Sequence, residues 1–354
     1  MRARRTAVLA LLAPLLSVGL TQPAGAAPTR GATCPPSARA VGFSDALDKL
    51  TRDDATLGGL SDIAWDRRAR SYVSSVDNHG TDPARLWFYR DPLHPKVTRD
   101  PLVLRRPDGT AYTGVDADDE GLQVLPDGRY LVSSETEPAI RVFGRDGVQR
   151  ASLPVPARFR VTPAGEATAN ATLEGLALTP RGDRVVAAME GVLSGDHDAD
   201  LRRMAVYDRR HGRFTVTKQV GYRVDPGMRV AEVQAYGEDR LLVLEAAFDP
   251  ATGNTIRLYA VRGLDHARDV SRVTDLAAAP ARDVVRKTLV ADVTACPSLG
   301  ATSEETQVNP LMDNFEGMTI GPVRRHRATV TLVSDDNFSD TQKTRLLTLE
   351  ARLP

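Results

Sequence analysis

Short runs of apolar residues alternate with polar ones along most of the chain, and this period of two is typical of β-strands. Five of these runs begin alike: an acidic residue comes first, a glycine usually follows, and alternating apolar residues come next. The five acids are Asp62, Glu120, Glu174, Glu232 and Glu316. They recur at intervals of 54 to 58 residues, with one interval of 84. A unit repeated at such a spacing predicts a repeat architecture.

Each repeat continues with a turn and further strands. Turn-forming residues at 126–128, 180–183 and 237–239 separate the first strand from a second strand of apolar, often β-branched residues. Additional strands follow, as at 85–89 and 140–143. No helical periodicity of useful length appears in these repeats. We therefore predict an all-β fold, a β-propeller of four-stranded antiparallel blades, with five blades favoured and six as the alternative.

Two segments bear on how the ring of blades is built. Residues 264–283, inside the long interval, form either an inserted loop or a degraded sixth blade. The last unit is short, and residues 39–50 could supply its missing outer strand and so close the ring. We divide the chain into a leader at 1–26, an N-terminal segment at 27–56 that includes this closing strand, and a propeller domain at 57–354.

The leader has the pattern of a secretory signal peptide. Arg2, Arg4 and Arg5 precede an apolar run at 7–20, and the small residues at 24–26 offer a cleavage site. The apolar run is too short for a comfortable membrane span. No cysteine for a lipid anchor follows the cleavage site. We expect residues 1–26 to be removed and the mature protein to be secreted, extracellular and independent of the membrane.

Charge and cysteine content narrow the function further. Lys+Arg and Asp+Glu both number 46, so no basic excess exists to hold a nucleic-acid backbone, and we expect a monomer without such a partner. The two cysteines, Cys34 and Cys296, are predicted to form a disulfide in an oxidising compartment, with a reactive thiol as the alternative. That bridge would close a loop worth roughly 4–5 kcal/mol in the loop-entropy model.

The second strand of each repeat ends on an acid as well. The start of the first strand and the end of the second lie at the same end of an antiparallel hairpin. If the first strands line a central channel, both sets of acids therefore gather at one mouth of it. The candidate metal ligands are Asp62, Asp77, Glu120, Glu135, Glu174, Glu190, Glu232, Glu245, Glu316, Asp335 and Asp336.

Such a ring of like charges needs compensation. Two carboxylates about 4 Å apart repel by roughly 1 kcal/mol in water and about 4 kcal/mol at an effective dielectric constant of 20. The protein must raise some pKa values, pair the acids with arginine, or bind cations. Ca²⁺ is the expected cation because it takes six to eight oxygen ligands. The alternative is that each acid accepts backbone N–H bonds and merely fixes its blade turn.

Other residue patterns favour this site over a protein nucleophile. The sequence has no GxSxG elbow, P-loop, GxGxxG or SxxK motif, and its six histidines show no paired metal-ligand spacing. Gly121, Gly175 and Gly317 follow three of the acids, where they permit a bulge or a close backbone approach. Arg223 and Arg229 could assist at the site, although we interpret them as ordinary surface arginines.

Several motifs resemble those of a known family. They are Asn-Ala-Thr-Leu-Glu-Gly-Leu-Ala-Leu-Thr-Pro at 170–180, Leu-Gly-Gly-Leu-Ser-Asp at 57–62, Asn-Phe-Glu-Gly-Met at 314–318 and Leu-Val-Ser-Asp-Asp-Asn-Phe at 332–338. Together they resemble the exported "esterase-like activity of phytase" family, over roughly residues 57 to 350. The resemblance implies a propeller with a carboxylate-rich, metal-dependent site. It also implies hydrolysis of phosphate or carboxylic esters.

We therefore expect an exported, Ca²⁺-dependent hydrolase of a small ester or phosphoester, working through metal-activated water. The expected catalytic residues are Glu120, Glu174 and Glu316. One alternative is a non-catalytic secreted propeller whose ring binds Ca²⁺ for stability or presents a ligand surface. Another is a lactonase-type propeller with one catalytic Ca²⁺ near the channel centre. The asparagines that keep this second alternative open are Asn78, Asn170, Asn314 and Asn337.

Overall fold

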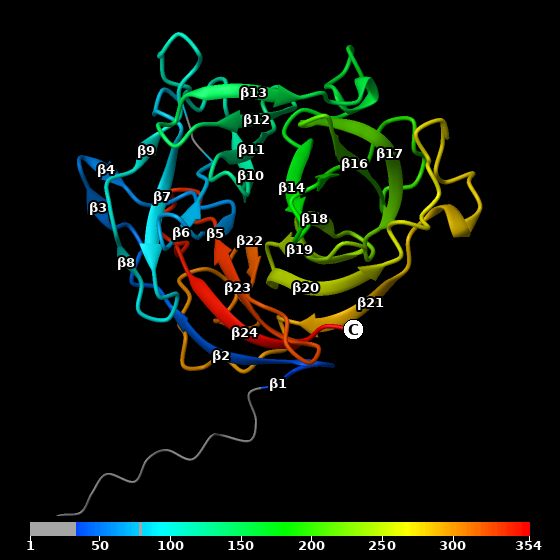
Figure 1. Ribbon diagram of the computed structural model, residues 1–354. Coiled ribbons are helices and arrows are strands. Elements are labelled where there is room, and N and C mark those ends of the chain that lie inside the picture. Colours follow the sequence, from blue (N-terminus) through cyan, green and yellow to red (C-terminus); the bar gives the residue numbers. More distant parts are fainter. Residues whose placement is uncertain (1–32, 78–79) are drawn as a thin grey trace, which may run out of the picture. The chain divides into compact units, whose positions relative to one another are not determined.

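The computed structural model describes residues 33–77 and 80–354. They form five sheets, each built on four antiparallel strands, and almost no helix, which confirms the predicted all-β propeller with five blades (Figure 1). The described helices are the 3₁₀ turns η1 (Ala157–Phe159) and η2 (Ala281–Asp283), and neither is long and apolar enough to cross a membrane. The predicted leader at 1–26 lies outside the described residues.

The blades follow one another along the chain. Blade 1 contains β5 (Ile63–Asp66), β6 (Ser71–Ser74), β7 (Arg85–Arg90) and β8 (Lys96–Val97), with β9 (Leu102–Val103) also paired to β7. Blade 2 contains β10 (Asp119–Val124), β11 (Tyr130–Ser134), β12 (Ala139–Phe143) and β13 (Gln149–Leu153). Blade 3 contains β14 (Leu173–Leu178), β15 (Arg184–Met189), β16 (Leu201–Arg210) and β17 (Arg213–Arg223).

The remaining strands complete the ring. Blade 4 contains β18 (Arg229–Gly237), β19 (Arg240–Asp249), β20 (Gly253–Arg262) and β21 (Lys287–Asp292). Blade 5 contains β22 (Phe315–Ile320), β23 (Arg327–Ser334), β24 (Leu346–Arg352), β2 (Ala38–Ser44) and the short β1 (Thr33–Cys34). A separate hairpin joins β3 (Thr51–Arg52) to β4 (Ala55–Thr56). The first strands β5, β10, β14, β18 and β22 each contact the first strand of both neighbouring blades, so they surround the axis of the ring.

The N-terminal segment is part of the last blade. Strand β2 pairs with β24 and lies on its outer side, so one sheet contains both ends of the described chain. Cys34 and Cys296 are joined across 262 residues, which confirms the predicted disulfide. Because Cys296 lies in the loop after β21, the disulfide ties the outer edge of blade 5 to blade 4.

The long interval contains a loop and no additional blade. The Val270 amide donates to the Gln219 carbonyl on β17 at 3.0 Å, so the insertion lies against the outer strand of blade 3. The buried Arg203 donates to both oxygens of Asp196 at 2.7 Å and to the Val270 carbonyl at 2.8 Å. Val270 and Leu276 are buried against Leu201. The inserted-loop interpretation is therefore right, and the sixth-blade alternative is wrong.

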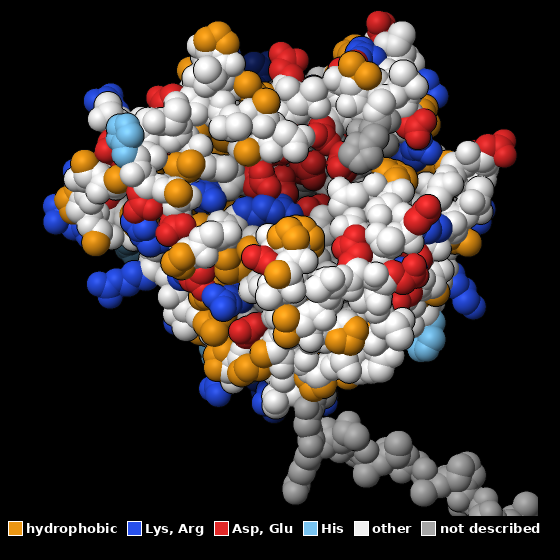
Figure 2. All heavy atoms as spheres, turned by 180° about the vertical axis from the view of Figure 1, so that it is seen from behind, with side chains coloured by type: hydrophobic (Ala, Val, Ile, Leu, Met, Phe, Trp, Pro, Cys, Tyr) orange, Lys and Arg blue, Asp and Glu red, His pale blue; other side chains and the backbone are white. Residues whose placement is uncertain are grey.

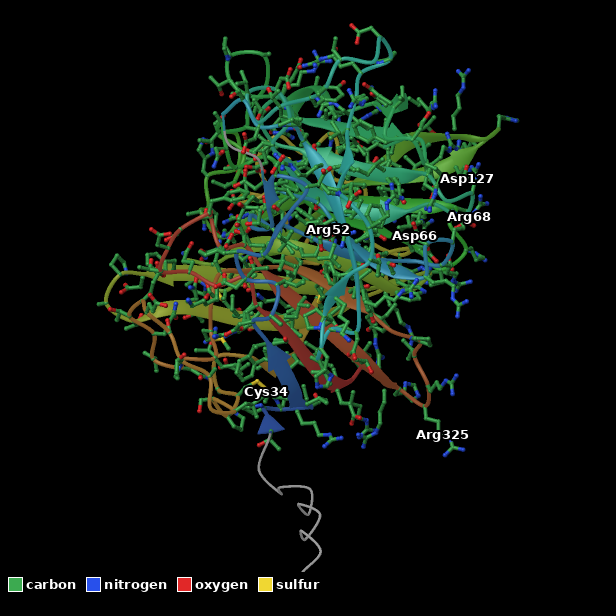
Figure 3. All side chains as sticks on the ribbon, turned by 90° about the vertical axis from the view of Figure 1, so that its left-hand side faces the viewer. Cys34, Arg52, Asp66, Arg68, Asp127 and Arg325 are labelled. Carbon is green, nitrogen blue, oxygen red and sulfur yellow. A yellow bond between two sulfur atoms is a disulfide. The ribbon has the colours of Figure 1, made fainter. Side chains whose placement is uncertain are left out.

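Polar contacts tie neighbouring blades together at their hairpin turns. Figure 3 shows Asp66, Arg68 and Asp127 on the same side of the propeller, where the turns of blades 1 and 2 lie. The buried Asp66 accepts hydrogen bonds from the Arg68 amide at 2.9 Å and from the Tyr130 hydroxyl of blade 2 at 2.8 Å. Arg145, also from blade 2, forms an ion pair with the same carboxylate. These bonds and the buried apolar residues between blades hold the first strands in register around the channel.

Candidate functional site

The motif acids of the five blades fall into two structural classes. Glu120, Glu174 and Glu316 each lie at an irregularity in the pairing of the first two strands, and they stand two residues before an apolar residue, which is Leu122, Leu176 and Met318 in turn. Such a bulge turns a side chain away from its regular direction. Asp62 and Glu232 instead come directly before the corresponding apolar residues, Ile63 and Val233, and Glu232 is the first residue paired after the irregularity of its strand. They therefore occupy the place that glycine has in the other three blades, one residue further along the strand.

Asp62 and Glu232 meet between the first strands, and we call them the central carboxyl pair. Their oxygens accept backbone N–H bonds from all five first strands. Asp62 accepts from Ile63 at 2.7 Å, Leu122 at 2.7 Å and Met318 at 3.2 Å, and Glu232 accepts from Leu176 at 3.1 Å and Val233 at 2.7 Å. The two carboxyls are also hydrogen-bonded to each other. This pair thus fastens the inner strands to one another.

The central carboxyl pair holds a proton. Burial raises the pKa of Asp62 to about 8, against the opposing effect of its backbone hydrogen bonds. Burial, followed by the charge of Asp62, raises the pKa of Glu232 well above its usual range. A hydrogen bond between two carboxyl groups needs one of them to be protonated. The alternative interpretation of the motif acids, that they accept backbone N–H bonds, therefore describes these two.

The three motif glycines let neighbouring first strands approach one another closely. A Cβ atom on Gly121 would lie 2.6 Å from the Leu176 Cβ, and one on Gly175 would lie 2.7 Å from the Val233 nitrogen. A Cβ atom on Gly317 would lie 2.5 Å from the Asp62 Cα. Each glycine therefore lets its strand approach the next blade more closely than any side chain allows. The predicted close backbone approach is confirmed at all three positions.

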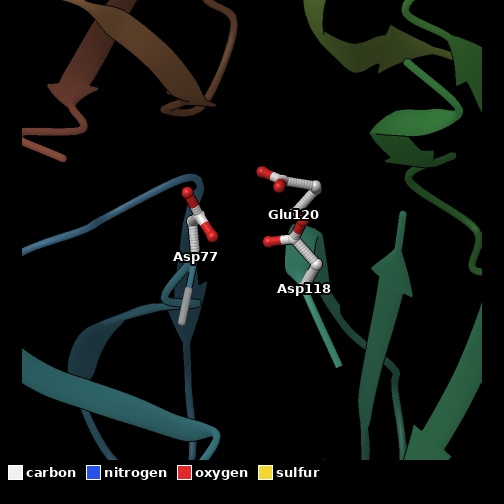
Figure 4. A group of neighbouring side chains, drawn as sticks. All are labelled: Asp77, Asp118 and Glu120. Carbon is white, nitrogen blue, oxygen red and sulfur yellow. The ribbon is translucent and has the colours of Figure 1, made fainter. Parts of the chain in front are cut away.

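A second group of acids lies where the first strands begin, and we call it the acidic mouth. Its members are Asp77, Asp118, Glu120, Glu135, Glu174, Glu190, Glu316 and Asp335. One carboxylate oxygen from each of Asp77, Asp118 and Glu120 lies within 4.8 Å of the other two. The same holds for Glu120, Glu135 and Glu174. Figure 4 shows the Asp77 side chain facing those of Asp118 and Glu120. In Figure 2 acidic side chains gather in a hollow on this face of the molecule.

Burial and mutual repulsion make these acids hard to ionise together. Burial, followed by the neighbouring Asp118, raises the pKa of Asp77 to about 10. Burial, followed by Glu190, raises the pKa of Glu135 to about 8. The pKa of Glu120 lies well above its usual range because burial is reinforced by Glu174 and the other acids around it. At neutral pH the acidic mouth therefore holds protons that a bound cation would displace.

Arg229 neutralises one side of the acidic mouth. Its guanidinium lies 2.8 Å from a Glu174 oxygen, 3.2 Å from Glu190 and 2.5 Å from Glu316. It also donates to the Asn314 side-chain oxygen at 3.3 Å. These carboxylates raise the pKa of the Arg229 guanidinium despite its burial. The interpretation of Arg229 as a surface arginine is therefore wrong, because it lies inside the group.

Two acids proposed as ligands lie in other networks, and Arg223 lies on the surface. Glu245 is buried and accepts from Lys287 at 2.5 Å and from the Asp225 amide at 2.8 Å. It is paired with Val230 inside the sheet, whereas Glu135 and Glu190 follow the ends of their strands. Asp336 accepts from the Gly59 amide at 2.7 Å and from Lys49 at 3.1 Å, so it fixes a turn. Arg223 is exposed and pairs with Asp198 at 2.8 Å.

Sequence reasoning missed Asp118 and did not assign Asn314 and Arg229 to the group of acids, although all three stand at one place in their repeats. Asp118 and Asn314 stand two residues before Glu120 and Glu316. Arg229 stands two residues before Ala231, which replaces the acid in blade 4. This position adjoins the acids of the site: Asp118 belongs to one acid group with Glu120, the Asn314 amide donates to Glu316, and Arg229 pairs with Glu174 and Glu316. A comparison of the repeats two residues upstream of the acid could have found Asp118 and grouped it with the other two.

The acidic mouth suits a hard cation. Its two groups of three acids offer only carboxylate oxygens, the ligands that Ca²⁺ prefers. One oxygen of Asp118 is buried without a hydrogen-bond partner among the described residues. Buried polar atoms normally have such a partner, so an unpartnered oxygen beside other acids is consistent with a cation ligand. Imidazole and thiolate ligands, which zinc prefers, do not occur in these two groups of described residues.

Fold and site together define a five-bladed propeller with an acid-lined channel mouth. Residues 55–338 match the family described as "Phytase-like: Esterase-like activity of phytase". The chain belongs to this family, as its motifs imply. No curated protein matches the chain.

The chain is distantly similar to several solved structures. One is the PQQ-bound aldose sugar dehydrogenase of Streptomyces coelicolor, with 12% identity and a TM-score of 0.38, covering 83% of this chain and 80% of that one. Virginiamycin B lyase of Staphylococcus aureus has 9% identity and a TM-score of 0.34, covering 85% and 68%. The Cps50 (Swd1) β-propeller domain of Myceliophteria thermophila has 9% identity and a TM-score of 0.36, covering 82% and 83%. Similarity at this level says nothing about function.

Proposed function

We propose that this protein is an exported hydrolase of phosphate or carboxylic esters that depends on Ca²⁺ bound at the acidic mouth. The main support is that Glu120 belongs to both groups of three carboxylates there. Membership of the phytase-like family supports the class of reaction. The disulfide fits the oxidising compartment that an exported protein reaches.

The proposed cation ligands are the members of the two acid groups, Asp77, Asp118, Glu120, Glu135 and Glu174. Divalent cations held there would polarise a substrate oxygen and lower the pKa of a bound water molecule. The carboxyls release protons as the cations bind, because their raised pKa values keep some of them protonated at neutral pH.

The predicted catalytic acids take different roles in this proposal. Glu120 and Glu174 contribute ligand oxygens. Glu316 acts as a positioning residue, because its carboxylate holds Arg229 and accepts from the Asn314 amide at 3.0 Å. Arg229 then presents a fixed positive charge beside the site, which favours an anionic ester oxygen.

A non-catalytic, Ca²⁺-stabilised propeller is the second candidate. The central carboxyl pair supports it, because this fold demonstrably uses two of its motif acids for structure. The lactonase-type alternative has less support. Of its asparagines, Asn314 adjoins the acidic mouth, Asn337 donates to Gln342 at 2.9 Å and Asn170 is exposed, whereas Asn78 lies outside the described residues.

Hydrolysis assays with and without chelator test the proposal. Phosphomonoesters, aryl esters and lactones are assayed with Ca²⁺ and with excess EDTA, using the Glu120→Gln and Glu245→Gln variants as a matched pair. We expect one ester class to be hydrolysed with Ca²⁺, and at least about a 100-fold loss with EDTA or in Glu120→Gln, as expected when a transition-state contact is removed. Glu245→Gln should keep its activity.

The possible outcomes separate the candidates. Hydrolysis that survives excess EDTA contradicts a metal-dependent mechanism. Ca²⁺ binding by calorimetry together with inertness on every ester favours the non-catalytic propeller. Export is tested separately by N-terminal sequencing of secreted protein, which should begin at Ala27.

A further inference from the structure

A second cavity opens at the other end of the channel. Its volume is about 770 Å³, and its walls come from all five blades. Its lining includes Trp65, Gln123, Leu178, Gln234 and Ile320, which lie toward the ends of the five first strands. The acidic mouth lies where the same strands begin. This far cavity is therefore separate from the proposed hydrolytic site.

The central carboxyl pair lies between the two sites. Gln234 follows Glu232 by two residues, and Gln123 follows Gly121 by two. Side chains two residues apart in a strand point to the same face, so both glutamines lie next along the channel after the layer that holds the pair. Asp62 and Glu232 use their oxygens to accept N–H bonds from the five first strands, so this layer of the channel lies between the far cavity and the acidic mouth.

Two buried amides of the far cavity lack partners. Gln123 and Gln234 are each only 7% exposed. The side-chain nitrogen of each is buried and makes no hydrogen bond among the described residues. Buried amide groups in folded proteins normally have partners. Two of them at the floor of one cavity therefore indicate a ligand with hydrogen-bonding groups.

The rim offers a flat apolar surface. Trp65 is 45% exposed, whereas the other tryptophan, Trp87, is fully buried. The Trp65 ring is held edge to face against Tyr72, with centroids 5.0 Å apart. Trp65 lines the cavity, and an exposed indole fixed in this way loses little conformational entropy when a ligand covers it.

Charge excludes two ligand classes. Arg67 is the one charged residue among the described residues that line the cavity. A phosphate ligand normally needs several cationic or N–H donors, and a metal ion needs several carboxylates. The cavity instead combines neutral amides, threonine hydroxyls and aromatic rings, which suit a neutral molecule with both apolar and polar faces.

We propose that the far cavity binds a neutral carbohydrate. A sugar ring has one face of C–H groups that can lie on Trp65 and hydroxyls that both donate and accept hydrogen bonds. The amides of Gln123 and Gln234 also do both, so they complement hydroxyl groups. This site is independent of the proposed hydrolysis, since the two share no lining residue.

Trp65 supplies a direct readout, because ligand contact changes its fluorescence whereas Trp87 stays buried. The full chain is titrated with maltotriose, cellotriose and triacetylchitotriose, and with trigalacturonate as an anionic comparison. We expect at least one neutral trisaccharide to saturate the fluorescence change with Kd on the order of 0.1–1 mM, confirmed by calorimetry. Trigalacturonate should bind at least about tenfold more weakly, because the cavity offers one cation.

Variants locate the binding. Trp65→Ala and the double variant Gln123→Ala/Gln234→Ala should each weaken binding by about tenfold or more in calorimetry. Phe248→Ala, which removes an aromatic ring that is 59% exposed outside the cavity, is the matched control and should bind normally. Asp118→Asn at the acidic mouth should also bind normally. Melting temperatures show whether each variant folds, and Gln234→Glu, which adds a charge, gives a second variant at the floor.

Three results would overturn the proposal. One is the absence of saturable binding by every neutral trisaccharide at about 10 mM, which would mean that water alone satisfies the amides. Another is undiminished binding in a folded Trp65→Ala protein. The third is tighter binding of trigalacturonate than of any neutral sugar, which would assign the cavity to anionic ligands.

Discussion

The central carboxyl pair and the acidic mouth are built from the same repeated motif but do opposite things. In the pair, two carboxyls accept N–H bonds from five strands and share a proton. In the mouth, eight carboxyl groups lie together, and Arg229 is the one described cation that forms ion pairs there, with Glu174, Glu190 and Glu316. A shift of one residue along the strand therefore separates an acid that holds the fold together from an acid that can bind a cation.

The largest expected effect is on the free energy of unfolding, which should respond differently to substitution of an acid in the two regions. Asp62→Asn replaces one accepting oxygen by an NH₂ group, which cannot accept a hydrogen bond. The orientation of the amide determines whether the Leu122 or the Met318 N–H loses its acceptor. In Ca²⁺-free solution we expect the free energy of unfolding to fall by about 1–3 kcal/mol. Glu120→Gln should leave it unchanged or raise it, because burial and the surrounding acids make this carboxyl costly to ionise and an amide cannot ionise.

Urea unfolding of both variants in EDTA measures this contrast. Asp100→Asn, which changes an exposed acid paired only with Arg52 on the surface, is the control and should have little effect. If Glu120→Gln destabilises the Ca²⁺-free protein as much as Asp62→Asn does, the division into two classes of acid is wrong.

A smaller effect of the acidic mouth should appear in how stability and Ca²⁺ affinity depend on pH. The folded-state pKa values of Glu135 and Asp77 are raised to about 8 and about 10, above those of unfolded carboxyls near 4. The folded state therefore binds more protons than the unfolded state between these values, and Ca²⁺-free stability should fall as pH rises through that window. Ca²⁺ affinity should rise over the same window, because cations and protons compete for the same oxygens.

Calorimetry in buffers of different ionisation enthalpy checks this linkage. We expect proton release on Ca²⁺ binding. We also expect the affinity to rise at least about tenfold from pH 6 to pH 8, which corresponds to about 1.4 kcal/mol. An affinity that does not depend on pH would show that the mouth acids are already ionised without the cation.

The smallest expected effect belongs to an acid outside both regions. Glu245 is held by Lys287 and Tyr222, so Glu245→Gln should change Ca²⁺ affinity by no more than about twofold. Its effect should appear instead as lost stability, because Lys287 then lacks one of its two anionic partners. A large loss of Ca²⁺ affinity in this variant would show that Glu245 is a metal ligand after all. Calorimetric titration of the folded variant decides between the two.

Much of the fold could be predicted because it depends on local patterns. Alternating strands, turns and equal spacing indicate four-stranded blades, and two cysteines indicate one disulfide. The inserted loop at 264–283 could not be told from a blade, because its place is set by contact with β17 far away in sequence. In the site, the convergence of Glu120 and Glu174 follows from repetition, whereas the role of Arg229 does not, because its partners come from blades 3 and 5.

By itself the sequence determined the residue types and their periodic spacing, and these suffice for a propeller whose acids recur at one end of each hairpin. Only the tertiary structure decided which carboxyls fill the centre and which face a cavity. The physical reason is that a carboxyl group's state depends on the donors and charges within a few ångströms. In this protein those neighbours come from other blades, where a bulge of one residue changes what each side chain meets.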